Sequence, residues 1–566
     1  MYRRPTLHAP KLNGAALKAV SVLAHNPLLG PIIRAQMVGQ VGMATLREAR
    51  LTEPPTLNPD IPRHNGPSLE GLPDLSPAMA ASHQKVAGWR PHTVAQFHAA
   101  YRGGKVNAEE VAARVLKATE DSDLMTPPLR AIVAQKREDV LQQAKASAAR
   151  WRDGRALGPL DGVPVVIKDE VHVDGYPTTV GTRFMGSRPT GPEATAVRRL
   201  RNAGALLIGK TNMHELGMGV TGVNPNLGSP RNPYDLRRFT GGSSSGTGSA
   251  VAAGLSPLGL GADGGGSIRI PAAFCGVVGL KATFGRVSEA GAAPLCWSVA
   301  HVGPLGGTAA DVALGYAVMA GIDPLDGNTA HQPPVDLTGM DDTDLSGVRL
   351  GVYWPWFEDA EPDVVAACKR ALEGLKVLGA TVVDIEIPDL DLVRLAHLVT
   401  IASEMAIARE AHFAAEWSEY GPDISLNMAM VESLSSADYV QAQRVRTRIT
   451  RTLQDLFGRV DGIVTPTTGI TAKVISPAAL GSGESNLGLL ESIMRYVLLA
   501  NLTGVPAISV PVGQDREGMP VGLHIMGRPW EEAGLLRMAH ALEGVVERRA
   551  PAFHVSLLRE GEIPAE

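Results

Sequence analysis

The chain has 566 residues, 44% of them hydrophobic and 20% charged, which is typical of a globular protein large enough for several packed cores. Its net charge is −5 and no block of five like charges occurs, so we expect no dedicated surface for nucleic acid. The three cysteines show neither a metal-ligand spacing nor an even disulfide set, which favours a reducing, cytoplasmic setting and no metal.

Residues 1–50 are predicted to form two short helices that act as an arm or cap on the main body. One helical face is formed by Leu29, Ile32, Ile33, Met37 and Val41. Such a face either packs on the protein itself or meets lipid or an apolar substrate. No run of 18 apolar residues occurs, so no segment is expected to span a bilayer. The Pro-rich stretch 51–84 is expected to be an extended linker.

Helical and strand patterns alternate through residues 85–566, which we interpret as one catalytic domain. Helices are predicted near 93–102, 107–121, 136–153, 193–203 and 246–254. Strands are predicted at 163–167, 205–209, 258–262, 348–354, 380–387, 461–467, 506–512 and 521–527. This alternation predicts an α/β layer structure in which helices cover a central sheet.

Three motifs suggest other functions. Residues 204–211 (GALLIGKT) match the phosphate-loop pattern, but their middle positions are a predicted strand where the chemistry needs a glycine-rich turn. Residues 242–246 (GSSSG) match G-x-S-x-G and would make Ser244 the nucleophile of an α/β-hydrolase. A polar loop precedes them in place of a buried strand, so that alternative is open but weaker. We interpret His214 as support for a nearby loop.

Two glycine-rich stretches contain residues suited to amide cleavage. The first reads TGGSSSGTGSAVAAG and includes Ser243, and the second begins GADGGGSIRIP and includes Ser267. Amide hydrolysis needs an activated nucleophile, donors for the oxyanion and a proton for the leaving nitrogen. Consecutive glycines let backbone N–H groups converge on one point. The candidate oxyanion hole consists of the N–H groups of Gly264, Gly265, Gly266 and Ser267.

Lys168 follows an apolar predicted strand and is the candidate base. Burial disfavours the charged form of an amine, so a buried Lys168 could accept a proton. The hydroxyl of Ser243 can relay that proton, because it both donates and accepts. The alternative is a surface lysine paired with Asp169.

These three segments together resemble the amidase signature family, whose Ser–cis-Ser–Lys triad hydrolyses amides. Further similar blocks are GKTNMHELGMGVTG, DGIVTPTT and ANLTGVPAISVPVGQDREGMPVGLHIMGRPW, so the resemblance covers about residues 85–545. It implies the amidase-signature fold, a large central mixed β-sheet covered by helices on both faces. It also implies that Lys168 is the base, Ser243 the bridging serine after a cis peptide bond, and Ser267 the acyl-enzyme nucleophile, with no cofactor.

The resemblance extends to supporting residues. Ser244 takes the place of a supporting hydroxyl, and Asp263 and Arg269 take that of an ion pair flanking the nucleophile. The chain departs from the family at Gly264, where threonine is usual, and at Ala282, where proline is usual. Neither change removes a catalytic group.

Within this family the chain is similar to plant-type fatty acid amide hydrolases, because the arm and the GADGGGSIRIP, HELGMGVTG and IMGRPW segments fit that branch. The similarity implies a hydrophobic tunnel for a fatty acyl chain, N-acylethanolamines as substrates, a homodimer, and a candidate peripheral membrane contact through residues 1–50. Candidate lining residues are Met218, Gly219, Ile493, Met494, Val497 and Leu498.

Three other functions remain as alternatives. A general aliphatic or aryl-acyl amidase would use the same triad on smaller substrates. The glutamine-dependent component of an amidotransferase for misacylated tRNA would share the chemistry but normally lacks a helical arm. A non-enzymatic scaffold is the weakest alternative, because all three catalytic groups are present.

Overall fold

The computed structural model describes all residues except 1, 3, 6, 8, 67–70, 85, 87, 187–190 and 564–566. A mixed sheet of eleven strands forms its centre, in the order β2-β4-β3-β5-β7-β6-β12-β13-β10-β8-β9. The strands are β2 (Ile132–Ala134), β3 (Pro164–Lys168), β4 (Leu206–Thr211), β5 (Leu258–Ala262), β6 (Val278–Lys281), β7 (Val302–Gly306), β8 (Arg349–Val352), β9 (Thr381–Asp384), β10 (Gly462–Pro466), β12 (Ala507–Gln514) and β13 (Pro520–Gly527).

The sheet is parallel at two places and antiparallel in between. Strands β4, β3 and β5 run parallel, as do β10, β8 and β9. The pairs from β5 through β7, β6, β12 and β13 to β10 are antiparallel, as is the edge pair β2–β4. All eight predicted strands are present, which confirms a large mixed sheet, whereas β2, β6 and β7 were not predicted.

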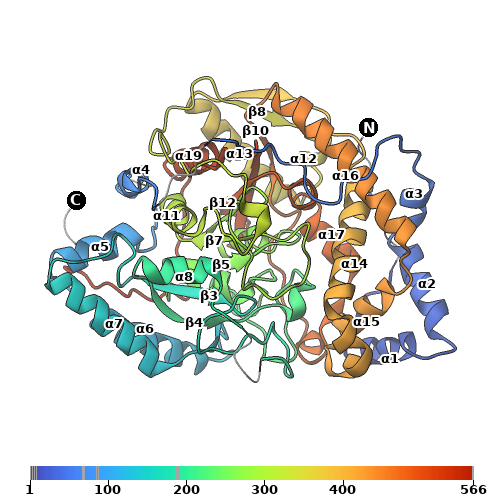
Figure 1. Cartoon of the computed structure of the whole chain (residues 1–566), viewed down its shortest axis with the longest axis horizontal. Helices are drawn as coiled ribbons and strands as arrows, with labels where there is room; N and C mark the ends of the chain where they lie inside the picture. Colours follow the sequence, from blue (N-terminus) through green and yellow to red (C-terminus); the bar gives the residue numbers. More distant parts are fainter. Residues whose placement is uncertain are drawn as a thin grey trace.

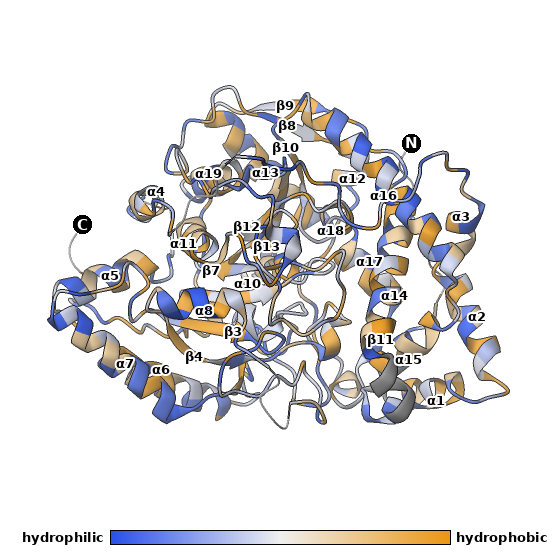
Figure 2. Cartoon of the chain, in the orientation of Figure 1, coloured by the Kyte–Doolittle hydropathy of each residue, from blue (hydrophilic) through white to orange (hydrophobic). Residues whose placement is uncertain are grey.

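Helices flank this sheet (Figure 1). They are α5 (Val94–Arg102), α6 (Ala108–Asp123), α7 (Arg137–Arg152), α8 (Thr195–Asn202), α9 (Ser245–Ala252), α10 (Arg269–Cys275), α11 (Ala309–Met319), α12 (Trp354–Phe357), α13 (Pro362–Val377), α17 (Leu487–Met494), α18 (Leu498–Thr503) and α19 (Glu532–Glu543). Every residue of β3, β5, β6 and β7 is buried, and the strands labelled in the middle of Figure 2 are largely apolar. Strands covered on both faces need such continuous apolar sequence.

The predicted arm forms three helices, one more than expected. They are α1 (Gly14–Ala24), α2 (Gly30–Gln40) and α3 (Met43–Glu48). The arm packs on α14 (Leu390–Glu416), α15 (Pro422–Val431) and α16 (Ser436–Phe457), at the right of Figure 1. Just before α1, the two-residue strand β1 (Leu12–Asn13) pairs with β11 (Glu484–Ser485). The arm is therefore joined to the body by both helix packing and strand pairing.

The described residues of the predicted linker 51–84 contain one short helix, α4 (Ser76–Ala81). Its first part is held on α16, where Arg448 Nε lies 2.9 Å from Glu53 Oε1. Residues 67–70 of the linker, and 1, 3, 6 and 8 of the arm, lie outside the described residues. The division into arm, linker and catalytic domain remains a prediction.

Candidate active site

Lys168 is the last residue of β3, and its side chain is only 1% exposed. The strand is buried along its whole length, so the side chain of its final residue, Lys168, is buried as well. The Nζ atom donates hydrogen bonds to Ser243 Oγ at 2.8 Å and to the Ala262 carbonyl at 3.2 Å. The base and the bridging serine predicted from sequence are therefore in direct contact.

Glu170 is a second partner of this amine, and the sequence analysis missed it. Its Oε2 lies 2.6 Å from Lys168 Nζ, and its side chain is 8% exposed. Asp169, the partner considered as the alternative, instead pairs with buried Lys210 at 3.0 Å. The alternative of a surface lysine bound to Asp169 is therefore wrong.

Ser243 follows a cis peptide bond from Gly242, as the resemblance implied. The next residue, Ser244, is fully buried, with its Oγ donating to the Ala262 carbonyl at 3.2 Å and its N–H donating to the Ser267 carbonyl at 3.2 Å. Ser244 thus links the two glycine-rich stretches through its backbone and side chain. No strand leads directly into Ser244, so the α/β-hydrolase alternative lacks its structural context.

Ser267 lies in a loop that a buried ion pair holds in place. Asp263 and Arg269 are both completely buried, with Arg269 Nε 3.0 Å from Asp263 Oδ2. Burial alone would raise the pKa of the Asp263 carboxyl, but the charge and hydrogen bonds of Arg269, with a hydrogen bond from Asn501, hold it well below its usual range. Arg269 also donates to His524, and Asn501 Nδ2 donates to Asp263 at 2.9 Å.

The Asp263 carboxylate reduces the number of N–H groups that are free for the predicted oxyanion hole. The Gly266 N–H donates to Asp263 Oδ1 at 2.6 Å, so this N–H is already engaged. Among the contacts described, the N–H groups of Gly264, Gly265 and Ser267 have no protein acceptor. These three are the donors left for an oxyanion.

A cavity of about 400 Å³ connects this site with the arm. Lys168, Ser243 and Ser267 lie along its wall, together with Gly264 and Gly265. Side chains from the N-terminal residues contribute part of the apolar lining: Leu7, Leu12, Val20, Ile33, Met37 and Val41. Three arm residues from the predicted apolar helical face, namely Ile33, Met37 and Val41, therefore line the cavity.

Four of the six predicted lining residues lie on the cavity wall. Met218, Gly219, Met494 and Leu498 line the cavity. Ile493 and Val497 do not, because they are fully buried in the apolar cluster behind the wall. Adjacent residues of a helical segment point in different directions, and the sequence did not indicate which of them faces inward.

Sequence analysis also missed the wall formed by α14. Leu398, Ile401, Ala402 and Met405 from this helix line the cavity. Their spacing of three and four residues is typical of one helical face. That spacing was a usable signal in the sequence.

The remaining motifs have structural roles. Residues 206–211 of the phosphate-loop pattern form β4, and Lys210 is buried against Asp169. His214 is buried with Nε2 3.6 Å from Asp423, beside the cavity-lining Gly219. Within the described part of the chain, no group of three His, Cys, Asp or Glu side chains is arranged to hold a metal. No helix among the described residues is long and apolar enough to cross a bilayer.

Comparison with known proteins adds four findings. A family model described as "Amidase" matches residues 114–536. A fatty acid amide hydrolase of Oryza sativa subsp. indica is 37% identical over 98% of this chain and 96% of its own length. A glutamyl-tRNA(Gln) amidotransferase subunit of Chloroflexus aggregans is also 37% identical, but over 80% of this chain and 96% of its own. Among solved structures, a peptide amidase from Stenotrophomonas maltophilia matches with a TM-score of 0.71, 30% identity, and coverage of 82% of this chain and 99% of its own.

Proposed function

The chain belongs to the amidase signature family, and from this premise we propose that it is a fatty acid amide hydrolase. Its substrates are N-acylethanolamines and related N-acyl amines, which it cleaves to a free fatty acid and an amine. Amidase chemistry follows from the family. The choice of substrate depends on the cavity and the arm.

One observation carries the choice of substrate. The cavity that has Ser243 and Ser267 on its wall is lined largely by apolar side chains, including those of Val20, Ile33 and Met37 from the arm. A fatty acyl chain with its carbonyl at Ser267 would bury its methylenes against those side chains, at about 0.8 kcal/mol for each buried CH₂ group. The match to the rice fatty acid amide hydrolase spans nearly the whole chain and so includes this arm.

The reaction starts with proton transfer from the nucleophile. Ser267 attacks the amide carbonyl while its proton passes to Ser243, and Ser243 passes its own proton to uncharged Lys168 over the 2.8 Å contact. The ammonium that forms is stabilised by Glu170. The oxyanion is held by the free N–H groups of the nucleophile loop.

The second half of the cycle reverses this relay. Lys168 returns a proton through Ser243 to the departing nitrogen, the C–N bond breaks, and the acyl group stays on Ser267. Water then attacks the acyl-enzyme, with the same two residues accepting its proton. The fatty acid leaves, and the hydroxyl of Ser267 is restored.

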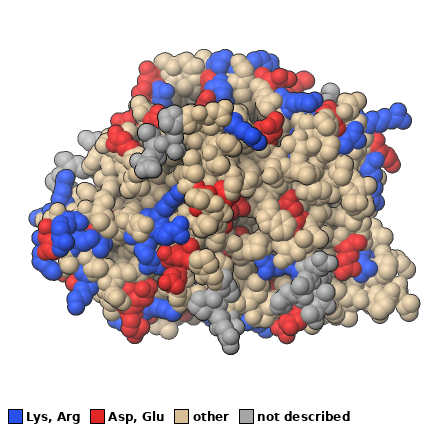
Figure 3. Space-filling view, in the orientation of Figure 1, with Lys and Arg blue, Asp and Glu red and all other residues tan. Residues whose placement is uncertain are grey.

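The arm also supports a proposal about location. Residues 21–33 contain no charged side chain, and Val22, Leu28, Leu29 and Ile32 are exposed at the corner between α1 and α2. This corner, at the lower right of Figure 3, shows few charges, whereas both signs are interspersed over much of the rest of that face. We propose a cytoplasmic enzyme that touches membranes through this corner, where lipid amides would reach the cavity. The expected homodimer stays a prediction.

The tRNA-dependent amidotransferase is the second candidate, because the identity of its subunit to this chain equals that of the plant enzymes. Its match covers 80% of the chain, against 98% for the rice enzyme. The rice match covers nearly the whole chain and therefore includes the arm, which lines the cavity. The arm therefore favours the lipid amide hydrolase.

A substrate panel tests the proposal. Purified protein is assayed with N-acylethanolamines of two to eighteen carbons, with simple aryl and primary amides, and with glutamine. We expect kcat/KM to rise with acyl length and glutamine to be a poor substrate. A kcat/KM that stays constant or falls with acyl length would indicate a general amidase. Efficient glutamine hydrolysis would favour the amidotransferase.

A further inference from the structure

A histidine in the cavity wall makes a hydrogen bond to the loop that carries the nucleophile. His397 lies on α14, is 2% exposed, and its Nε2 is 2.7 Å from the carbonyl oxygen of Gly264. It also lines the cavity that contains Ser267. No motif surrounds His397 in the sequence, and the relay from Ser267 through Ser243 to Lys168 does not use it.

The hydrogen bond to Gly264 shows which ring nitrogen of His397 carries the proton. A carbonyl oxygen only accepts, so Nε2 carries the hydrogen and donates it. Burial lowers the pKa of His397 to about 4. The ring is therefore neutral near neutral pH, with its proton on Nε2 and none on Nδ1.

The contact orients the next peptide group. The Gly264–Gly265 peptide is trans, since it is not among the cis bonds of the described chain. In a planar trans peptide the C=O and N–H bonds point in opposite directions. With the carbonyl of Gly264 directed at His397, the N–H of Gly265 points away from α14. That N–H is one of the three donors left free in the nucleophile loop.

Packing also restricts this peptide. A Cβ added at Gly265 would lie 2.9 Å from Cε1 of His397 and 3.1 Å from Cε of Met494. Position 265 therefore has no room for a side chain beside α14 and the end of α17. Two glycines without side chains would otherwise be free to rotate this peptide.

We propose that His397 is a positioning residue of the oxyanion hole, holding the Gly264–Gly265 peptide so that the Gly265 N–H faces the developing oxyanion. The inference rests on the proposed amide hydrolysis at Ser267 and identifies one of its oxyanion donors. His397 acts through the backbone and leaves the proton relay untouched. Its contribution therefore belongs to the transition state and not to the binding of the acyl chain.

Three variants test the proposal. His397→Leu removes the donor, His397→Gln places an amide N–H near the position of Nε2, and His397→Asn carries an amide too short to reach Gly264. Thr400→Val is the matched control, because Thr400 is a buried α14 residue one turn further on that bonds to Ala396 and Gln443 and does not line the cavity. Each variant is assayed with a long-chain and a short-chain N-acylethanolamine.

We expect kcat to fall about 10- to 100-fold in His397→Leu and His397→Asn with KM little changed, since removing an oxyanion donor outright costs about 100- to 1000-fold. His397→Gln should recover most of the rate, and Thr400→Val should behave as the wild type. A long-chain trifluoromethyl ketone, which forms an oxyanion on the serine, should lose affinity in step with kcat. Binding of the product fatty acid should not change.

Three results would overturn the inference: an unchanged kcat in His397→Leu, no recovery in His397→Gln relative to His397→Asn, or equal losses for the ketone and the fatty acid. If the Leu variant does not fold, the Gln and Asn pair decides the question alone. Failure of the proposed lipid substrate would show as a wild-type enzyme that prefers the short amide. The variants would then still be compared on that short amide.

Discussion

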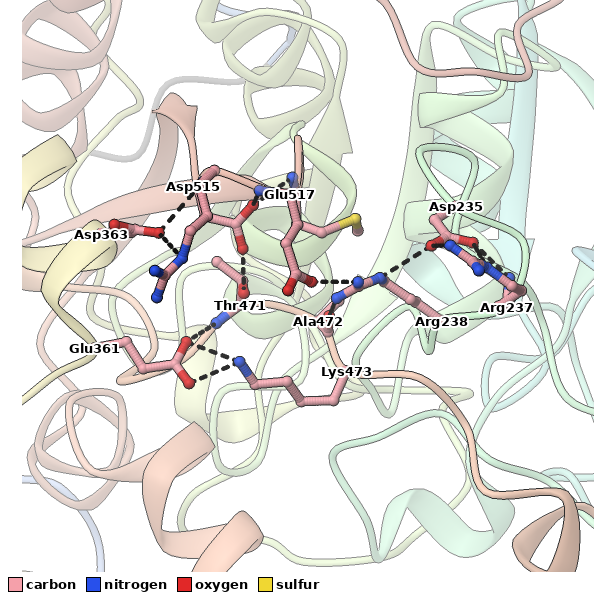
Figure 4. A network of polar contacts seen from close by, with 12 residues as sticks. Asp235, Arg237, Arg238, Glu361, Asp363, Thr471, Ala472, Lys473, Asp515 and Glu517 are labelled. Carbon is pink, nitrogen blue, oxygen red and sulfur yellow. Dashed lines mark hydrogen bonds and ion pairs between the residues drawn. The ribbon is translucent and has the colours of Figure 1, made fainter.

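Two polar networks hold the chain around the bridging and nucleophilic serines, one buried and one at the surface. The buried network ties Ser267's loop together through Asp263 and Arg269, whose side chains are both 0% exposed. The surface network holds the loop that leads to Ser243, and Arg238 is at its centre, bonded to Asp235, Glu517 and the Ala472 carbonyl (Figure 4).

The two networks differ in what can replace a lost contact. Water can solvate a broken pair at the surface, where the side chain of Glu517 is 58% exposed, so each surface pair contributes little. A buried charge that loses its partner has no such replacement. The surface network also spreads over separate pairs, including Lys473 with Glu361 at 2.7 Å. We therefore expect a single substitution to lower the free energy of unfolding strongly in the buried network and only slightly in the surface network.

Loss of the nucleophile should have the largest effect. Ser267→Ala removes the atom that forms the acyl-enzyme, and we expect kcat to fall by a factor of about 10⁴ or more. The melting temperature should change little, because Ser267 donates no side-chain hydrogen bond among those described. Amide hydrolysis and thermal unfolding are the two measurements. Near-normal turnover would show that another residue is the nucleophile.

Breaking the buried ion pair should produce the largest loss of stability. Arg269→Met leaves the Asp263 carboxylate buried without its cation, which costs about 3–5 kcal/mol of unfolding free energy. Activity should fall as well, since Asp263 anchors the N–H groups of Gly266 and Ile268. Chemical denaturation of the variant measures the first effect. A loss under about 1 kcal/mol would contradict the assigned role.

The sequence predicted the parts of this site that depend on local motifs, and it missed the parts that depend on contacts between distant segments. Lys168, Ser243 and Ser267 lie in glycine-rich or strand-end segments whose chemistry can be identified locally, and the structure places Lys168 against Ser243. Glu170 is only two residues from Lys168, but a strand end does not indicate which neighbouring acid turns inward. The sequence analysis considered Asp169 as the partner, whereas the structure pairs Lys168 with Glu170.

The missed parts depend on contacts between distant segments. Helix α14 was not predicted, although it supplies one cavity wall and His397. Its contact with Gly264 joins residues 133 positions apart. Ile493 and Met494 are neighbours at the end of α17, and Val497 and Leu498 are neighbours at the start of α18. Tertiary packing decides which residue of each pair faces the cavity.

Glu170 provides the next test of the buried network. Glu170→Gln keeps the size of the side chain but removes the charge that stabilises protonated Lys168. We expect kcat/KM to fall about 10- to 100-fold, because the ammonium that forms on Lys168 would lose the carboxylate that stabilises it. Glu289, Cys296 and Arg409 interact electrostatically with Glu170 and stay unchanged. An unaltered kcat/KM would remove Glu170 from the relay.

Glu215 tests a buried carboxyl beside the cavity. Burial raises its pKa from 4.5 to about 8, so the folded protein holds a proton that the unfolded chain releases. Stability from this group is fully present below pH 4.5 and declines as the pH rises toward 8. Relative to Glu215→Gln, the wild type should lose roughly 3–4 kcal/mol between about pH 5 and 8. Parallel stability curves for the two proteins would contradict this.

The surface network should give the smallest effect. Glu517→Gln breaks the contact with Arg238, and we expect a change of about 0–1 kcal/mol in unfolding free energy, which shrinks further in high salt. Activity should stay within about twofold of the wild type on the same argument. Denaturation at low and high ionic strength measures the change. A loss as large as that of Arg269→Met would erase the distinction between the two networks.

The most direct measurement locates the nucleophile on the enzyme. Wild-type protein is mixed with a long-chain alkyl fluorophosphonate, whose phosphorus is attacked by the serine oxygen with loss of fluoride, and the protein is then digested and sequenced by mass spectrometry. The account predicts a single adduct on Ser267, reduced when Lys168 is changed to alanine. An adduct on Ser243 or Ser244, or no adduct at all, would contradict it.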